Sequence, residues 1–66
     1  MNNYTDTEKM RLRCEAFLHA MLGKDHVSSW WQRKNLAFNS ITPEQMWSIS
    51  PEKVYDYLVG HVDKYG

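Results

Sequence analysis

The sequence has little of what stabilises or targets proteins outside the cytoplasm. It contains one cysteine, Cys14, so no disulfide can form within the chain. No apolar run approaches the roughly 20 residues that a membrane helix needs, and no secretory signal pattern precedes Cys14. We therefore expect a cytoplasmic protein that does not enter a membrane.

An excess of charge of either sign is also lacking. Eight basic and eight acidic residues give a formal net charge of zero, whereas proteins that bind phosphate backbones usually carry a positive field. The local cations Lys9, Arg11 and Arg13 are flanked by Glu8 and Glu15, as on a solvated helix face. Arg11 and Glu15 are four residues apart, the spacing of an ordinary surface pair on a helix. Nucleic acid is therefore a less favoured partner than protein.

The small size argues against an enzyme. A chain of 66 residues predicts a single domain, residues 1–66, which buries only about 60% of the surface that its unfolded form exposes. Such a core seldom supplies more than about 3–5 kcal/mol, which leaves little stability for an active-site cleft.

Residue patterns for catalysis or metal binding are absent as well. The candidate nucleophile is Cys14, with His19, His26 or His61 as a base, but Cys14 falls on the apolar side of a predicted helix, where a free cysteine acts as a small hydrophobe. The histidines show no zinc-ligand spacing, and the three glycines are isolated and form no phosphate loop. We predict no catalytic residues, no metal and no cofactor.

Apolar spacing and capping signals predict an all-α fold. Thr5 and Glu8 have the spacing of a capping box, and Gly23 is a typical helix stop. A second helix can be capped by Asp25 or Ser28. The prediction is a small bundle of three to four helices, at about residues 6–22, 26–34, 43–49 and 51–64.

The segment between the second and third predicted helices lacks a periodic pattern. We expect residues 35–40 to be irregular, with Leu36 and Phe38 pointing inwards because they are the large apolar side chains there.

Two helix starts in the second half are almost identical. The run Ile41-Thr42-Pro43-Glu44 is echoed eight residues later by Ile49-Ser50-Pro51-Glu52. In each, a hydroxyl can cap the first amides, proline suits the first helical position and glutamate suits the helix dipole. Ile41 with Met46, and Ile49 with Val54, have the spacing of a hydrophobic staple.

Aromatic residues are abundant for so thin a core: three tryptophans, four tyrosines and two phenylalanines. Tryptophan and tyrosine dominate interface energetics, so a surplus points to association. An alternative assigns Trp47 and Tyr57 to the core and places His61 against Tyr57 or Tyr65. The candidate partner-binding residues are Trp30, Trp47, Tyr55, Tyr57, His61 and Tyr65.

Residues 30–58 carry a motif series that resembles a known domain. Its parts are Trp31, Asn35-Leu36-Ala37-Phe38, the run Thr42-Pro43-Glu44-Gln45-Met46-Trp47 and Val54 with Leu58. This series resembles the toxin-binding domain at the C-terminus of Xre/MbcA/ParS-type antitoxins, which usually has glycine where this chain has Asn39 or Ser40. The resemblance implies an antitoxin-like inhibitor that docks on a toxin acting on NAD or transferring ADP-ribose and blocks its active site, with a homodimer as one assembly.

A second hypothesis is a small accessory protein of a phage or other mobile element that regulates transcription through DNA or a DNA-bound protein. The first two predicted helices around Gly23 permit a helix-turn-helix interpretation. The adjacent Trp30 and Trp31 are poorly suited to reading base edges. We therefore expect a protein partner first.

Overall fold

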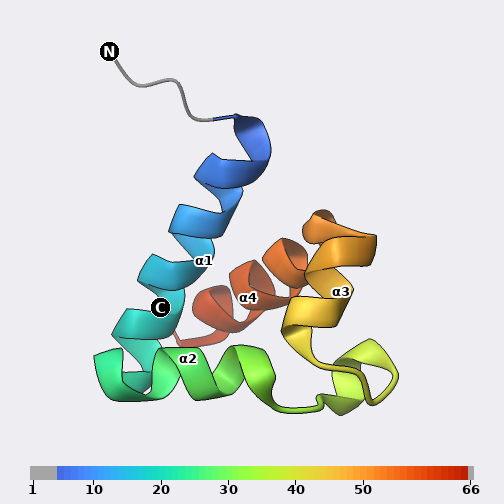
Figure 1. Cartoon of the computed structure of the whole chain (residues 1–66). Coiled ribbons are helices and arrows are strands. Elements are labelled where there is room, and N and C mark those ends of the chain that lie inside the picture. Colours follow the sequence, from blue (N-terminus) through green and yellow to red (C-terminus); the bar gives the residue numbers. More distant parts are fainter. Residues whose placement is uncertain (1–4, 66) are drawn as a thin grey trace.

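A computed structural model describes the backbone of residues 5–65 and the side chains of residues 5–61. The prediction of an all-α bundle is confirmed, and no strand occurs within residues 5–65 apart from an isolated antiparallel bridge between Asn35 and Ile41. The elements are α1 (Asp6–Leu22), α2 (Lys24–Gln32), the short 3-10 helix η1 (Leu36–Phe38), α3 (Pro43–Ile49) and α4 (Pro51–Tyr65) (Figure 1).

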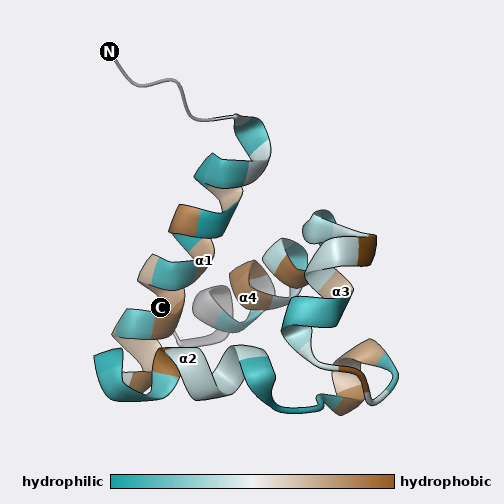
Figure 2. Ribbon diagram, in the orientation of Figure 1, coloured by the Kyte–Doolittle hydropathy of each residue, from teal (hydrophilic) through white to brown (hydrophobic). Residues whose placement is uncertain are grey.

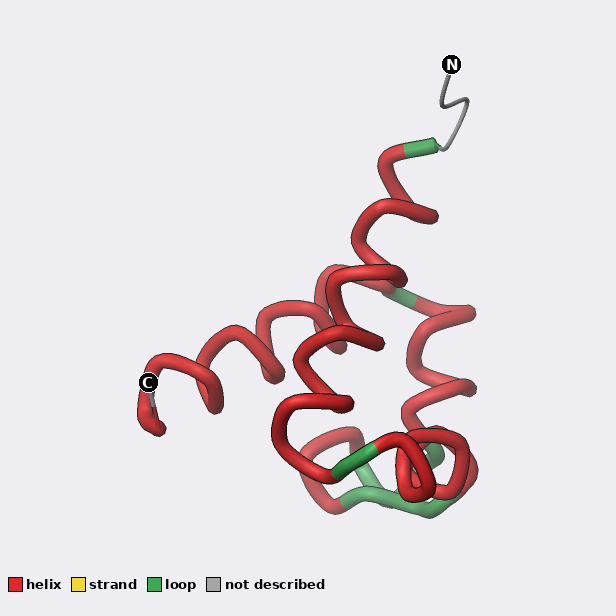
Figure 3. Tube along the Cα trace, turned by 90° about the vertical axis from the view of Figure 1, so that its left-hand side faces the viewer, coloured by secondary structure: helices red, strands yellow, loops and turns green. Residues whose placement is uncertain are grey.

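The four α-helices form a ring in which each helix packs against two others. α1 packs against α2 and α4, and α3 packs against the same two helices from the other side. In Figure 1, α2 runs across the foot of α1, η1 lies at the far end of α2, and α3 rises from there. Figure 3 shows that the last turns of α4 extend beyond the rest of the bundle.

Every helix contributes to one small core. Cys14 and Leu18 of α1 and Leu58 of α4 are at most 1% exposed, which confirms the predicted burial of Cys14. Among the residues with described side chains, the core cluster comprises Cys14, Leu18, Val27, Trp31, Phe38, Met46, Val54 and Leu58, and Pro43 is buried as well.

The boundary between α1 and α2 differs from the sequence prediction. α1 begins at the predicted capping box of Thr5 and Glu8 and ends at Gly23, as expected. The second helix predicted at about residues 26–34 is confirmed, but it begins and ends two residues earlier, as α2 (Lys24–Gln32). The predicted cap at Asp25 or Ser28 is wrong, because the N-cap is Gly23 itself. Gly23 has φ 83°, which lets the chain turn within one residue, so α2 starts at once.

The loop around η1 corrects a second prediction. Phe38 is buried at 3% exposure, as expected, but Leu36 is 88% exposed and does not point inwards. The reason is the 3-10 conformation: with three residues per turn, side chains two positions apart cannot share one face. Asn39 and Ser40 then take left-handed backbone angles, φ 59° and 64°, and the Ser40 amide donates to the carbonyl of Asn35 at 3.0 Å.

The two proline-led helix starts are both confirmed as the beginnings of α3 and α4. Met46 and Val54, the predicted inner staple residues, are buried, and Ile41 packs against the core. The staple predicted for Ile49 is wrong, because Ile49 is 71% exposed and lies outside the core cluster.

Candidate functional site

Three of the predicted partner-binding residues lie together. The rings of Trp30 in α2 and Tyr57 in α4 are stacked with centroids 6.5 Å apart, and the His61 ring lies 4.2 Å from that of Tyr57. His61 Nδ1 is 3.0 Å from the carbonyl oxygen of Tyr57. All three side chains are half-buried, so each keeps part of its ring at the surface. We call these three residues the aromatic face.

The other predicted contact residues lie elsewhere. Trp47 packs edge-on against Trp31, with centroids 5.8 Å apart, and is half-buried. Tyr55 faces α1, with its ring 6.3 Å from that of Phe17 and its hydroxyl 3.5 Å from Nη1 of Arg13. The side chain of Tyr65 lies outside the described residues. Tyr55 therefore supports the packing of α1. Trp47 is joined to the aromatic face through Trp31, whose ring centroid lies 5.2 Å from that of Trp30.

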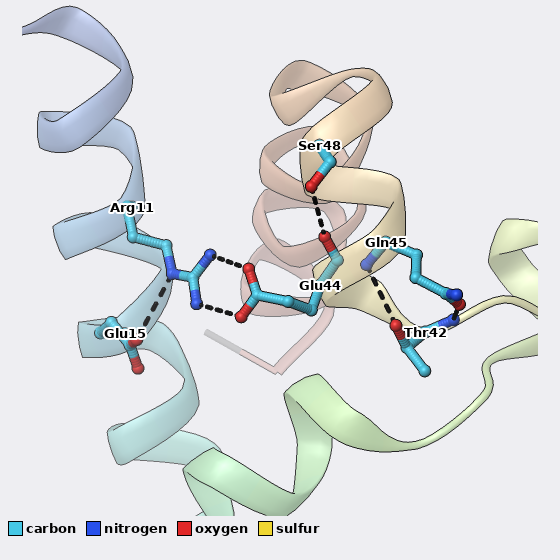
Figure 4. A network of polar contacts seen from close by, with 6 residues as sticks. All are labelled: Arg11, Glu15, Thr42, Glu44, Gln45 and Ser48. Atoms are coloured by element: carbon cyan, nitrogen blue, oxygen red, sulfur yellow. Dashed lines mark hydrogen bonds and ion pairs between the residues drawn. The ribbon is translucent and has the colours of Figure 1, made fainter.

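Arg11, which was not among the predicted site residues, contacts side chains of three helices, and Figure 4 shows its bonds to Glu44 and Glu15. Arg11 of α1 donates from Nη1 and Nη2 to the two carboxylate oxygens of Glu44 in α3, at 2.9 and 2.8 Å. Its Nε lies 3.5 Å from Glu15, which confirms the predicted helical pair. The guanidinium carbon lies 3.5 Å from the centroid of the Trp31 ring in α2, within cation–π distance.

The electrostatics of this cluster follow from the bidentate pair. The hydrogen bonds from Arg11 lower the pKa of Glu44, and the hydrogen bond with Glu44 raises the pKa of Arg11. Both groups stay charged, so the pair holds α1 to α3 and moves no proton. Arg11 and Glu44 are 33 residues apart, and no local pattern indicates such a contact.

A pocket opens beside η1, and we call it the η1 pocket. Its volume is about 490 Å³, and it lies between η1, the start of α3 and the first half of α4. Its lining residues are Ala37, Phe38, Asn39, Met46, Lys53, Asp56 and Tyr57. A smaller hollow of about 290 Å³ lies next to Arg11, Glu44 and Trp31. Tyr57 links the η1 pocket to the aromatic face.

The chemistry expected of Cys14 is that of an inert thiol. Burial raises the pKa of Cys14 to about 11, so the thiol stays protonated near neutral pH and is a poor nucleophile.

Among the residues with described side chains, no group of three potential metal ligands comes together. Within residues 5–65, no helix combines the length and apolar character needed to cross a membrane.

Comparison with known proteins gives no relative: no protein-family model matches the sequence, and neither curated proteins nor solved structures include one that is significantly similar.

Proposed function

We propose that the chain is a protein-binding module and that the aromatic face is its contact surface for a partner protein. The observation that carries this proposal is the grouping of Trp30 and His61 on either side of Tyr57, with ring centroids 6.5 and 4.2 Å from that of Tyr57 and all three side chains partly exposed. Tryptophan and tyrosine that are fixed by their neighbours lose little entropy on binding and supply most of the energy at interface centres. Trp30 belongs to α2 and the other two residues to α4, so the face spans two helices.

An antitoxin-like inhibitor is the form of this function that we favour. The resemblance of residues 30–58 to the toxin-binding domain motivates it, and the left-handed angles of Asn39 and Ser40 give it some support, because that domain usually has glycine there and glycine suits such angles. The partner would be an enzyme that acts on NAD or transfers ADP-ribose. Docking through the aromatic face would block access to its active site.

The proposal is tested by affinity purification from the host with three baits: the wild type, His61→Glu and Leu12→Glu. His61→Glu places a negative charge on the aromatic face. Leu12→Glu is the matched control, since Leu12 is a 51% exposed leucine on α1. We expect the wild type and Leu12→Glu to retain one stoichiometric protein and His61→Glu to lose it. Circular dichroism checks that all three baits are folded.

Two results would count against the proposal. One is the recovery of no stoichiometric protein by the wild-type bait. The other is a partner that binds His61→Glu as well as the wild type, since a charge at the centre of an interface should weaken binding by at least about tenfold. The antitoxin-like form is tested when the recovered protein, or the product of the neighbouring gene, consumes NAD. The wild type should then inhibit that NAD-consuming activity, and His61→Glu should not.

A further inference from the structure

The helix α2 packs mainly through two indole rings. Val27 is its one aliphatic residue, and Trp30 and Trp31 are its other apolar side chains. Figure 2 shows most of this helix in the colours of hydrophilic and intermediate residues. Trp31 is 3% exposed, whereas Trp30 is half-buried and belongs to the aromatic face. A buried ring and a ring of the candidate contact surface are therefore direct neighbours on one short helix.

The ring of Trp31 lies between the Arg11 cluster and the aromatic face. The guanidinium carbon of Arg11 is 3.5 Å from the centroid of this ring, and Trp30 packs edge-on against it with centroids 5.2 Å apart. Trp47 makes a second edge-on contact, with centroids 5.8 Å apart. The half-buried rings of Trp30 and Trp47 therefore both rest on the buried ring of Trp31.

The described residues make no hydrogen bond that would fix the orientation of Trp31. Its one side-chain polar atom is the donor Nε1, which is buried and has no acceptor among them. A buried tryptophan usually has such an acceptor. The orientation of this ring therefore depends on the groups that pack against it. Of the neighbours named above, the guanidinium of Arg11 lies nearest to the centroid of the ring.

Arg11 can hold this ring because its own guanidinium is held in place. Glu44 accepts hydrogen bonds from its Nη1 and Nη2 at 2.9 and 2.8 Å, and Glu15 lies 3.5 Å from its Nε. A bidentate pair fixes the plane of the guanidinium as well as its position. The cation over Trp31 is therefore a fixed group and not a side chain that moves freely in solvent.

Trp30 connects Trp31 to the rest of the aromatic face. Its ring is edge-on to that of Trp31, with an interplanar angle of 84°, and stacked on that of Tyr57, with an angle of 18°. A tryptophan side chain has only two torsion angles, so neighbours on two sides leave it little freedom. A rotation of the Trp31 ring would change the space available to Trp30 and with it the stacking on Tyr57.

We propose that Arg11 is a positioning residue of the aromatic face. Fixed by Glu44, its guanidinium holds the ring of Trp31, and that ring in turn fixes Trp30 against Tyr57. The face is then ordered before a partner arrives, which reduces the entropy that binding costs. This inference rests on the proposed function for the use of the face, whereas the orientation of Trp30 is a property of the chain alone and is measured without a partner.

The first experiment measures order parameters of the indole N–H groups of the free chain by NMR relaxation. We expect a value for Trp30 near about 0.85 in the wild type, as in rigid backbone, and below about 0.6 in Arg11→Met. Methionine keeps an unbranched side chain but has neither the charge nor the planar fork of arginine. Thr5→Ala is the matched control, because loss of one half of the capping box of α1 should lower Tm by about 4–8 °C without a change at Arg11 or Trp31. It should leave Trp30 rigid.

The second experiment uses two milder variants that separate the cation from its anchor. Arg11→Lys keeps the positive charge but loses the planar fork, and Glu44→Gln weakens the pair that fixes the guanidinium. Both should lower the order parameter of Trp30, by less than Arg11→Met does. Overhauser contacts between the ring protons of Trp30 and Tyr57 should weaken in the same order. Glu52→Gln, the corresponding change at the start of α4, should leave them unchanged, because the described partner of Glu52 is Ser50.

Two outcomes would overturn the inference. One is a Trp30 ring that is as ordered in Arg11→Met as in the wild type. The other is an equal loss of order in Thr5→Ala, since lower stability alone would then explain the effect. If circular dichroism shows that Arg11→Met is unfolded, Arg11→Lys and Glu44→Gln decide in its place. The proposed function fails separately, in the binding test of His61→Glu, which leaves Arg11, Glu44 and Trp31 unchanged.

Discussion

The two helix starts of the second half have nearly the same sequence and different surroundings. At the start of α3, Thr42 and Gln45 form a full capping box. The main-chain N–H of Gln45 donates to the Thr42 hydroxyl at 3.0 Å, and the main-chain N–H of Thr42 donates to the side-chain Oε1 of Gln45 at 2.9 Å. At the start of α4, the Ser50 hydroxyl donates to the Glu52 carboxylate at 3.3 Å. The first start is capped by side chains in both directions, whereas the one side-chain bond described at the second start is the long one between Ser50 and Glu52.

The glutamates and isoleucines of the two helix starts also differ in their contacts. Glu44 is bound by Arg11 from α1, whereas Glu52 bonds only within its own helix start among the described residues. Ile41 packs against the core, whereas Ile49 is exposed. The shared local pattern is therefore enough to begin a helix, but the neighbouring helices decide how much each residue contributes to stability.

The largest effect expected from this comparison concerns the isoleucines. Ile41→Ala should lower the free energy of unfolding by about 2 kcal/mol, because it removes apolar contact with the core. Ile49→Ala should lower it by less than about 0.5 kcal/mol, because the side chain is mostly in solvent. Urea unfolding measures both, and an unchanged m-value confirms that only stability has changed. Equal losses would show that Ile49 packs in solution as the staple pattern predicts.

A smaller contrast is expected between the two capping hydroxyls. Thr42→Ala should cost about 1 kcal/mol, since it removes one half of a capping box. Ser50→Ala should cost less than about 0.5 kcal/mol, below the usual range for a cap, because the bond from Lys53 N–H goes to the main-chain carbonyl of Ser50 and survives. In thermal unfolding, Thr42→Ala should lower Tm by about 4–8 °C. A Ser50→Ala variant that loses as much would mean that the second hydroxyl also caps its helix.

The accuracy of the sequence prediction follows from the range of each interaction. α1 and α3 were placed at their correct residues because capping pairs such as Thr5 with Glu8, and a proline at the first position of a helix, act within one turn. The start of α2 was misplaced because Gly23 both ends one helix and begins the next, a choice that depends on the packing of α1 against α2. Leu36 was misplaced because nothing in its local sequence indicates a 3-10 turn.

The candidate site shows the same limit. Trp30, Tyr57 and His61 could be named from composition and helical spacing, but their contact depends on the way in which α2 approaches α4. The pairing of Arg11 with Glu44 spans 33 residues, and at each position a local explanation was already sufficient: a surface pair on α1 and a favourable charge at the start of α3. Because the spacing of Arg11 and the position of Glu44 were already explained locally, nothing in the single sequence indicated that the two residues bind each other.

The smallest expected effect separates the two glutamates and depends on pH. At pH 7, Glu44→Gln should cost about 0.5–1 kcal/mol, the upper range for an ion pair that is partly exposed, because the bidentate geometry with Arg11 is lost. Glu52→Gln should change stability by less than about 0.3 kcal/mol, since its described partner is a hydroxyl. Urea titrations of both variants and the wild type give these differences directly.

The pH dependence of the Glu44 difference identifies its cause. Arg11 holds the pKa of Glu44 below its ordinary value of 4.5 in the folded chain, so the stabilisation is present above about pH 4.5 and is lost as the pH falls through the folded pKa. The gap between the wild type and Glu44→Gln should therefore narrow as the pH is lowered below about 4.5. The pKa of Glu8 is lowered as well, by its hydrogen bonds with Thr5, so the wild type alone would mix two titrations. Glu44→Gln retains Glu8, and the difference between the two proteins therefore reports Glu44. A gap that is as large at low pH as at pH 7 would show that the side chain stabilises α3 by packing and not through its charge.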